Sequence, residues 1–189
     1  MANDIVVSDT TLPGAQLIEV PRFDDERGWF AELWNEERYR ANGLDFTFAQ
    51  ANVSFSRRGV LRGMHFQWPS GQGKLVSVLS GVVFDAVIDV RVDSPTFGRW
   101  YGCELSYENR KQLWAPVGFA HGFLVLSDTA LVHYSCTVPY ERTADRSVAW
   151  DDPDVAIEWP MPPVLVSPKD RDAPRLASVA RSTLPHFGS

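Results

Sequence analysis

Short segments rich in β-branched and aromatic residues recur along most of this chain, and they constrain its fold more than any other feature. Glycine, proline, aspartate or asparagine separates each segment from the next, which is typical of strands joined by turns. Many short strands at regular spacing indicate a β-sandwich or a β-barrel. The expected strands are residues 17–20, 47–54, 74–79, 82–90, 100–105, 112–115, 122–126 and 131–137.

Helices are expected to be few and short, mostly on the N-terminal side and in the C-terminal tail. Asn35 is a suitable N-cap for a helix over residues 35–42, and Gly43 is a suitable stop. The segment from Asp151 onward is rich in proline and aspartate. We expect this segment to wrap over the β-core rather than join it.

The chain length favours a single domain. With 189 residues, one domain over residues 1–189 is the simplest organisation. We expect a barrel core at about residues 45–140 and a C-terminal tail at residues 151–189 that wraps around it.

Composition excludes several classes of protein. The formal net charge of −6 argues against a nucleic-acid surface, which usually carries clustered basic residues. Hydrophobic residues at 44% argue against disorder, and no apolar run has transmembrane length. The two cysteines give no disulfide framework, and the start of the chain lacks a signal-peptide pattern. These observations predict a cytoplasmic protein with no membrane partner.

Side chains alternate between the two faces of a strand, so the order of residues predicts which of them share a face. In residues 82–90, Phe84 and Ile88 share one face, and Asp85 and Asp89 share the other. By the same alternation His133 points away from Tyr134. If Tyr134 faces the interior, His133 lies outside the core.

A single histidine stands in the strand-like segment of residues 59–67, three residues after Arg62. No two of the four histidines have His-x-His or His-x-x-x-His spacing, so His65 is a poor start for a metal site. Its imidazole suits a metal-free general base, because its ordinary pKa lies near neutrality. A buried core histidine with one hydrogen bond is the alternative. Arg62 and His65 reach one pocket only if Gly63 interrupts the regular strand.

Several motifs, taken in order, resemble the dTDP-4-dehydrorhamnose 3,5-epimerase family of sugar-nucleotide enzymes. The matching motifs are residues 25–32, 50–52, 59–67, 72–76, 83–89, 94–98, 116–123 and 167–170. The resemblance covers residues 12–176. It implies a cupin-type jelly-roll fold, a homodimer, no metal and no cofactor. It also implies inversion at C3 and C5 of a dTDP-4-keto-6-deoxyhexose in dTDP-L-rhamnose biosynthesis.

The resemblance implies roles for four catalytic residues. His65 matches the base, Asp170 the carboxylate that pairs with it, Lys74 the donor at the enolate oxygen, and Tyr134 the acid. Structural interpretations stay open beside these roles. Lys74 could be a solvated strand end and Tyr134 a core-edge tyrosine. Asp170 could serve a helix start capped by Ser167, or serve both functions.

The resemblance also implies the substrate-binding residues. Arg27, Arg62 and His121 match phosphate or nucleotide contacts, and Tyr140 matches an aromatic residue that stacks on thymine. The remaining matches to contacts with the nucleotide or sugar are Glu32, Gln50, Asn52, Asp145 and Lys169. Asp85 is expected behind the site, paired with Lys74 or His65, because a buried carboxylate needs a partner.

Two departures from the family pattern leave alternatives open. His133 and Ser135 stand where the family more often has an apolar residue and a lysine. The loop of residues 138–142 is also unusual, and it could determine whether one carbon or both are inverted. A single-site epimerase for another dTDP-deoxysugar therefore remains an alternative, as does a non-catalytic sugar-binding cupin. The implied dimer exchanges strands, and Arg27 and Glu32 are the candidates to complete the partner's site.

Overall fold

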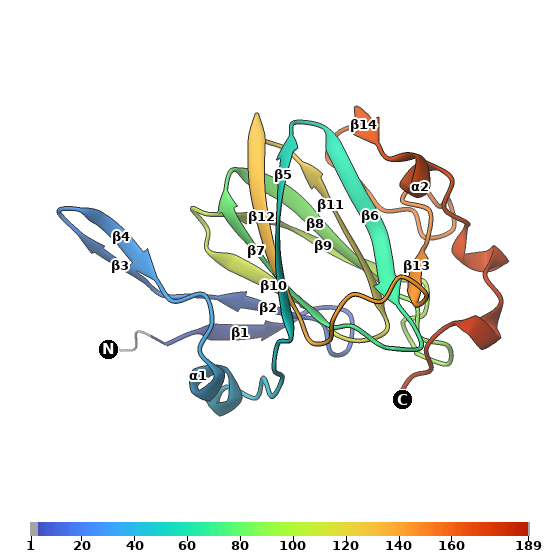
Figure 1. Cartoon of the computed structure of the whole chain (residues 1–189), viewed down its shortest axis with the longest axis horizontal. Coiled ribbons are helices and arrows are strands. Elements are labelled where there is room, and N and C mark those ends of the chain that lie inside the picture. Colours follow the sequence, from blue (N-terminus) through green and yellow to red (C-terminus); the bar gives the residue numbers. More distant parts are fainter. Residues whose placement is uncertain (1–3, 189) are drawn as a thin grey trace.

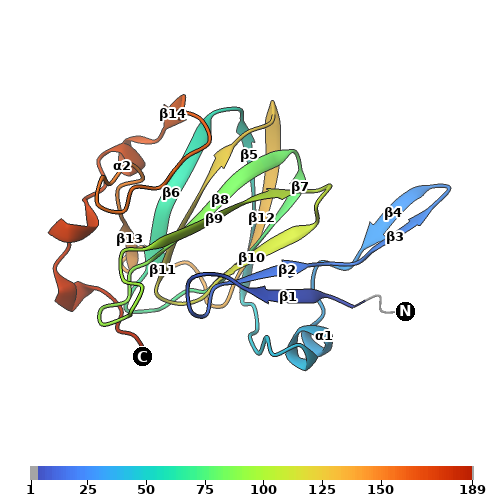
Figure 2. The ribbon, with the colours of Figure 1, turned by 180° about the vertical axis from the view of Figure 1, so that it is seen from behind.

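Two β-sheets packed face to face form the body of the protein. The computed structural model describes residues 4–188. Figures 1 and 2 show the two sheets from opposite sides. Neighbouring strands of the first sheet follow the order β1 (Val6–Asp9), β2 (Gln16–Glu19), β10 (Lys111–Ala115), β7 (Lys74–Ser80), β12 (Thr129–Cys136) and β5 (Gln50–Arg57).

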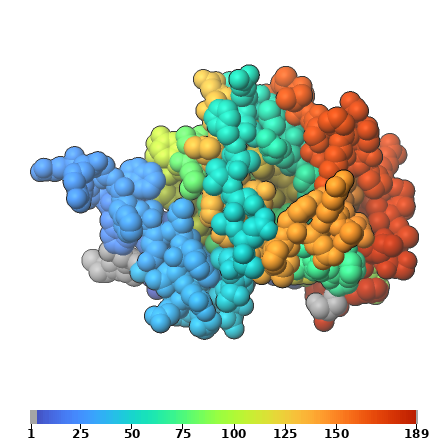
Figure 3. All heavy atoms as spheres, in the orientation of Figure 1, coloured from blue at the N-terminus to red at the C-terminus, as the bar shows by residue number. Residues whose placement is uncertain are grey.

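The second sheet contains the strand that carries His65. Its path runs through β13 (Asp145–Ser147), β6 (Val60–Gln67), β11 (Phe119–Val125), β8 (Val82–Asp89) and β9 (Trp100–Ser106). A separate hairpin of β3 (Arg22–Asp25) and β4 (Gly28–Ala31) projects from the body, as the space-filling view in Figure 3 shows. The expected mainly-β class with few short helices is confirmed. The two sheets extend beyond the expected core of residues 45–140, because β1 and β2 precede it in sequence and β13 follows it.

The C-terminal tail mostly covers the outer face of the second sheet. Leu176 and Leu184 are buried there in a cluster with Ile88. The expectation that the tail stays outside the sheets is wrong at β14 (Leu165–Val166), which pairs in parallel with β6. β13 covers only the far end of that edge of β6, and β14 supplies hydrogen-bonding partners at its beginning.

The predicted alternation in β8 is confirmed. Val83 and Val87 lie in the core between the sheets, whereas Ala86 and Ile88 lie under the tail. Burial on both faces accounts for the nearly continuous apolar sequence of this strand.

Two short α-helices flank the sheets. Asn35 caps α1 (Glu36–Ala41) by accepting a hydrogen bond from the Arg38 amide, as predicted. Gly43 follows with a φ of +83°, a left-handed conformation that suits glycine. The tail carries α2 (Pro168–Arg171) and two 3₁₀ turns, η1 (Leu176–Ser178) and η2 (Arg181–Thr183). Within residues 4–188, none of the helices has the length and apolarity needed to cross a membrane.

Candidate active site

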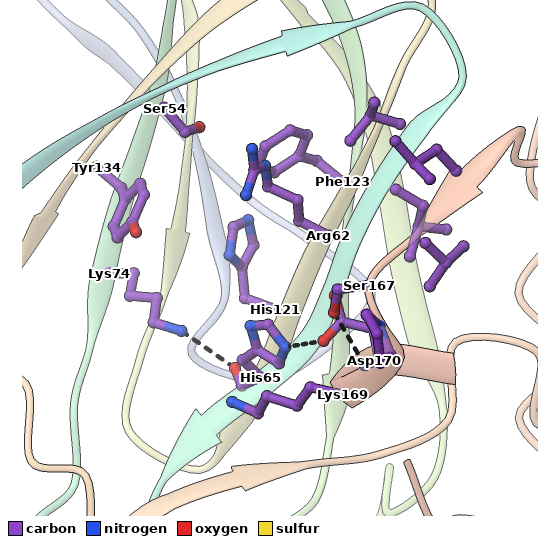
Figure 4. Close-up of a pocket in the computed structure, with 15 residues that line it drawn as sticks. Ser54, Arg62, His65, Lys74, His121, Phe123, Tyr134, Ser167, Lys169 and Asp170 are labelled. Carbon is purple, nitrogen blue, oxygen red and sulfur yellow. Dashed lines mark hydrogen bonds and ion pairs between the residues drawn. The ribbon is translucent and has the colours of Figure 1, made fainter. Parts of the chain in front are cut away.

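Two adjoining cavities, of about 460 and 380 Å³, open between the sheets. Both are lined by His65 from β6, Lys74 from β7, Tyr134 from β12 and Lys169 from α2. Figure 4 shows these side chains facing the first cavity. The three residues predicted to move protons or stabilise an enolate therefore meet at the junction of the two cavities.

An irregularity in β6 brings Arg62 and His65 to the same cavity. His121 of β11 lies opposite His65, but Phe123 lies opposite Arg62. The register therefore shifts, because the paired positions are three residues apart on β6 and two residues apart on β11. Gly63 has a φ of +142°, and a Cβ there would lie 2.5 Å from the Cα of Gly122. The predicted interruption at Gly63 is confirmed, and only glycine fits this close approach.

The imidazole of His65 is held by a buried carboxylate. Its Nε2 lies 2.6 Å from Oδ1 of Asp170. Burial would raise the pKa of the Asp170 carboxyl, but the hydrogen bond to His65 helps to hold that pKa below its ordinary value. Asp170 therefore stays ionised beside the imidazole, with its carboxylate held against Nε2 of His65.

The two predicted functions of the 167–170 segment fall on different atoms. The Ser167 hydroxyl caps α2 by accepting a hydrogen bond from the Asp170 amide at 3.1 Å. The Asp170 carboxylate is thereby left for His65. The capping motif places the carboxylate, and no single group serves both purposes.

Lys74 is buried at the junction of the cavities. Its Nζ donates a hydrogen bond of 3.1 Å to the carbonyl oxygen of His65. Among residues 4–188, no carboxylate forms an ion pair with it. Burial lowers the pKa of the Lys74 ammonium. An ammonium without a paired anion is suited to stabilise a negative charge that develops in the cavity.

Tyr134 lies across the junction from His65, with its phenol directed toward the cavities in Figure 4. Burial raises the pKa of the phenol, so it remains a proton donor at neutral pH. His133, the next residue along β12, does not line either cavity, as the alternation predicted.

Asp85 pairs with His121, and the expectation that it pairs with Lys74 or His65 is wrong. The Nε2 of His121 lies 2.9 and 3.1 Å from the two carboxylate oxygens of Asp85. The register of β8 and β11 places the two residues diagonally on one face, which the order of residues within either strand does not reveal. His121 lines the first cavity, and Asp85 lies behind it.

Arg62 adds a guanidinium to the basic side chains that line the first cavity. Its Nε donates to the Ser56 hydroxyl at 3.0 Å, and its guanidinium lies beside His121 in Figure 4. This bond, with a second one of 3.4 Å to the carbonyl of Phe55, orients the guanidinium without neutralising it. An anionic group could bind here although the chain as a whole is acidic.

The second cavity is polar. Gln50, Asn52, Tyr140 and Asp145, to which the resemblance assigns contacts with the nucleotide or sugar, all line it. Asp145 joins the Tyr140 hydroxyl, at 3.0 Å, to Nζ of Lys169, at 2.5 Å. Burial would raise the pKa of Asp145, but these hydrogen bonds, led by the one from Lys169, lower it. Asp145 is therefore an ionised link between the loop that carries Tyr140 and helix α2.

Two predicted residues lie away from both cavities. Arg27 is at the tip of the β3–β4 hairpin, where its side chain is 89% exposed and paired with Asp25. Glu32 follows the hairpin and pairs with Nε of Arg38 at 3.1 Å. Within one chain, neither residue contributes to the site.

Sequence reasoning missed several cavity residues. Ser54, Gln67, Gln72 and Phe123 line the cavities but were not predicted. Strand alternation was a usable signal for two of them, because Ser54 shares a face with Asn52 and Gln67 follows His65 by two residues. Within residues 4–188, no group of three or more His, Cys, Asp or Glu side chains has a geometry suited to a metal ion.

Fold and site together define a general acid–base enzyme built on a double-sheet β-scaffold. An oriented imidazole, a buried ammonium and a protonated phenol surround one cavity, with basic side chains at one end. Inversion of a carbon next to a carbonyl uses a base, a donor at the enolate oxygen and an acid on the opposite face, and these three groups suit those tasks.

Known proteins place this enzyme in a family. A model described as dTDP-4-dehydrorhamnose 3,5-epimerase matches residues 9–178. The enzyme of that name from Methanothermobacter thermautotrophicus is 49% identical over 166 residues, covering 86% of this chain and 90% of its own. The chain belongs to the dTDP-4-dehydrorhamnose 3,5-epimerase family, so the predicted resemblance and the isomerase class are confirmed.

Solved structures agree in fold. The 3,5-epimerase from Legionella pneumophila, in complex with dTDP-4-keto-L-rhamnose, has a TM-score of 0.94 and 44% identity, covering 98% of this chain and all of its own. A 3'-monoepimerase from Streptomyces bikiniensis, in complex with dTDP-quinovose, has a TM-score of 0.86 and 38% identity, covering 94% and 91%. The family model and the relatives named 3,5-epimerase support the predicted epimerisation at both carbons, and they do not favour the single-site alternative.

Proposed function

We propose that the protein converts dTDP-4-dehydro-6-deoxy-D-glucose to dTDP-4-dehydro-L-rhamnose by inverting C3 and C5 in turn. One observation carries the assignment of roles: the His65–Asp170 pair, Lys74 and Tyr134 converge on one cavity junction. Both reacting carbons flank the C4 ketone, so removal of either proton gives an enolate. One set of groups therefore serves both steps.

Each inversion uses the three groups in sequence. His65 takes the proton from carbon, and the ionised Asp170 stabilises the imidazolium. Lys74 donates a hydrogen bond to the enolate oxygen as charge develops there. Tyr134 then delivers a proton to the opposite face of the same carbon, which inverts its configuration.

The nucleotide diphosphate is proposed to bind through the polar and basic residues around this junction. Arg62 and His121 provide donors for phosphate oxygens. Tyr140 provides an aromatic ring that stacks on the thymine base. Polar contacts come from Gln50, Asn52, Asp145 and Lys169. The Legionella pneumophila relative, crystallised with dTDP-4-keto-L-rhamnose, supports a ligand of this class.

We propose a homodimer in which the hairpin of one chain completes the site of the other. Apolar side chains are exposed on the outer face of β5, where Phe55 is 59% exposed, and on the hairpin, where Phe30 is 66% exposed. Exposed apolar patches of this kind favour association. Arg27 and Glu32, which reach no cavity in their own chain, would then contact the nucleotide in the partner's cavity.

Mixing two inactive variants tests this shared site. Arg27→Ala and His65→Ala chains, each weak alone, are expected to regain activity when refolded together, because a mixed dimer contains one intact site. The measurement is the exchange rate of the mixture against each variant alone. A mixture no more active than the variants, or a monomeric protein with full activity, contradicts the proposal.

Solvent deuterium exchange tests the function itself. Wild-type protein incubated with the keto sugar in D₂O is expected to incorporate deuterium at both C3 and C5, as read by NMR. Incorporation at one carbon after long incubation would select the single-site epimerase. Binding without incorporation at either carbon would select the non-catalytic sugar-binding cupin.

We place the enzyme in the cytoplasm, acting on a small-molecule nucleotide sugar rather than on nucleic acid or membrane. Cys103 and Cys136 are both free thiols, which suits a reducing compartment. The acidic net charge supports the absence of a nucleic-acid partner.

A further inference from the structure

The loop between β12 and β13, residues 137–144, carries Tyr140 at the rim of the second cavity. Tyr140 is 55% exposed, so packing against neighbours restrains its ring only weakly. Its position must instead come from the main chain of the loop and from the bond of its hydroxyl to Asp145.

Side chains of three glutamines hold the main chain of this loop over four consecutive residues. Gln72 donates to the carbonyl of Val138 at 2.9 Å, and Gln67 donates to the carbonyl of Pro139 at 3.2 Å. Gln50 accepts from the amide of Tyr140 at 2.7 Å. Gln67 also accepts from the amide of Glu141 at 2.8 Å.

A primary amide suits this position better than any other side chain. The loop presents two carbonyls and then two amides, and a glutamine can both donate and accept. Gln67 meets groups of both kinds, and its nitrogen also donates to the carbonyl of Ser70 at 3.0 Å. Gln67 and Gln72 are only 4% and 7% exposed, so their own amide groups depend on these loop groups for hydrogen-bonding partners.

The same contacts connect the loop to His65, the proposed general base. Gln67 lies on β6 two residues after His65, and all three glutamines line the second cavity. From Tyr140 the contacts continue through Asp145 to Lys169, which precedes the His65 partner Asp170 on α2. The position of Tyr140 relative to His65 is therefore set from two directions.

We propose that Gln50, Gln67 and Gln72 form a glutamine clamp that positions Tyr140 and thereby sets the affinity for the nucleotide part of the substrate. Gln67 and Gln72 are positioning residues, since they act on the ligand through Tyr140. This inference rests on the proposed function, in which Tyr140 contacts the thymine base of the nucleotide. It assigns the loop's main-chain geometry to side chains on β5, on β6 and in the connection between β6 and β7.

Replacing Gln67 with methionine, which has a similar length and no charge, tests the clamp. Loss of the hydrogen bonds to Ser70, Pro139 and Glu141 is expected to weaken binding of dTDP, measured by calorimetry, by roughly tenfold or more. KM for the keto sugar should rise in parallel, whereas the exchange rate at saturation stays within about threefold, because the reacting groups are untouched. Gln72→Met removes a single bond and should give a smaller effect in the same direction.

Gln112→Met is the matched control. Gln112 is equally buried and bonded to Tyr39, Leu33 and Ser77, but it lies outside both cavities. This substitution should lower the midpoint of thermal unfolding without changing the affinity for dTDP. A similar loss of dTDP affinity in Gln112→Met and Gln67→Met would overturn the clamp, because general destabilisation would then explain both.

A double-mutant cycle with Tyr140→Ala tests whether Gln67 acts through the ring. In the Tyr140→Ala background, Gln67→Met should cause little further loss of dTDP affinity. Fully additive losses, or unchanged affinity in Gln67→Met, would overturn the inference while wild-type exchange at C3 and C5 leaves the proposed function standing. Wild-type protein that fails to bind dTDP would overturn both.

Discussion

His65→Ala is expected to abolish incorporation of solvent deuterium at both C3 and C5 of the keto sugar. His65 is the imidazole at the cavity junction held by an ionised carboxylate, at 2.6 Å from Asp170. Loss of a general base typically costs about 10²- to 10⁴-fold in rate. The measurement is the initial rate of incorporation at each carbon by NMR, at saturating substrate.

His186→Ala is the matched control for this experiment. His186 lies near the C-terminus, is largely exposed beside Asp93, and lines neither cavity. Its removal should leave both exchange rates unchanged. Near-normal exchange in His65→Ala would mean that another group is the base. Loss at one carbon alone would mean that the two inversions use different bases.

Lys74→Met is expected to lower activity and to raise stability at the same time. The ammonium donates to the carbonyl of His65 and has no carboxylate partner among the described residues, so its burial is costly in the absence of substrate. Removing a donor from a developing oxyanion should slow exchange by roughly 10²- to 10³-fold. Methionine fills a similar volume without a charge and should raise the free energy of unfolding by about 1–3 kcal/mol.

The pH dependence of this stability gain follows from the direction of the pKa shift. Burial lowers the pKa of Lys74 in the folded state below 10.5, so the unfolded chain binds more protons between the two values. Wild-type stability therefore rises with pH through that window, and the advantage of Lys74→Met should shrink as the pH approaches 10.5. Urea unfolding of both proteins at neutral and alkaline pH measures the difference. A less stable Lys74→Met protein at neutral pH would show that the lysine contributes more by its contacts than its charge costs.

The part of the fold that depends on short-range order was predictable. The positions of the eight expected strands, the two faces of β8 and the Asn35 cap follow from alternation and from groups within three residues of one another, whereas β1, β3, β4 and β13 were not expected. The tail strand β14 was not predictable, because its partner β6 lies about a hundred positions earlier in the chain. Its pairing depends on which stretch of the β6 edge other strands leave uncovered.

In the candidate site too, local features were predictable from the sequence and long-range partners were not. The order of residues alone singled out His65 as a base candidate and placed Tyr134 and His133 on opposite faces. It also predicted an interruption at Gly63 if Arg62 and His65 share a pocket. Only the tertiary structure decided that Asp85 belongs to His121, and that three glutamines hold the Tyr140 loop. The physical reason is that side-chain direction repeats locally along a strand, whereas partners are chosen by register and loop path, which bring together groups far apart in sequence.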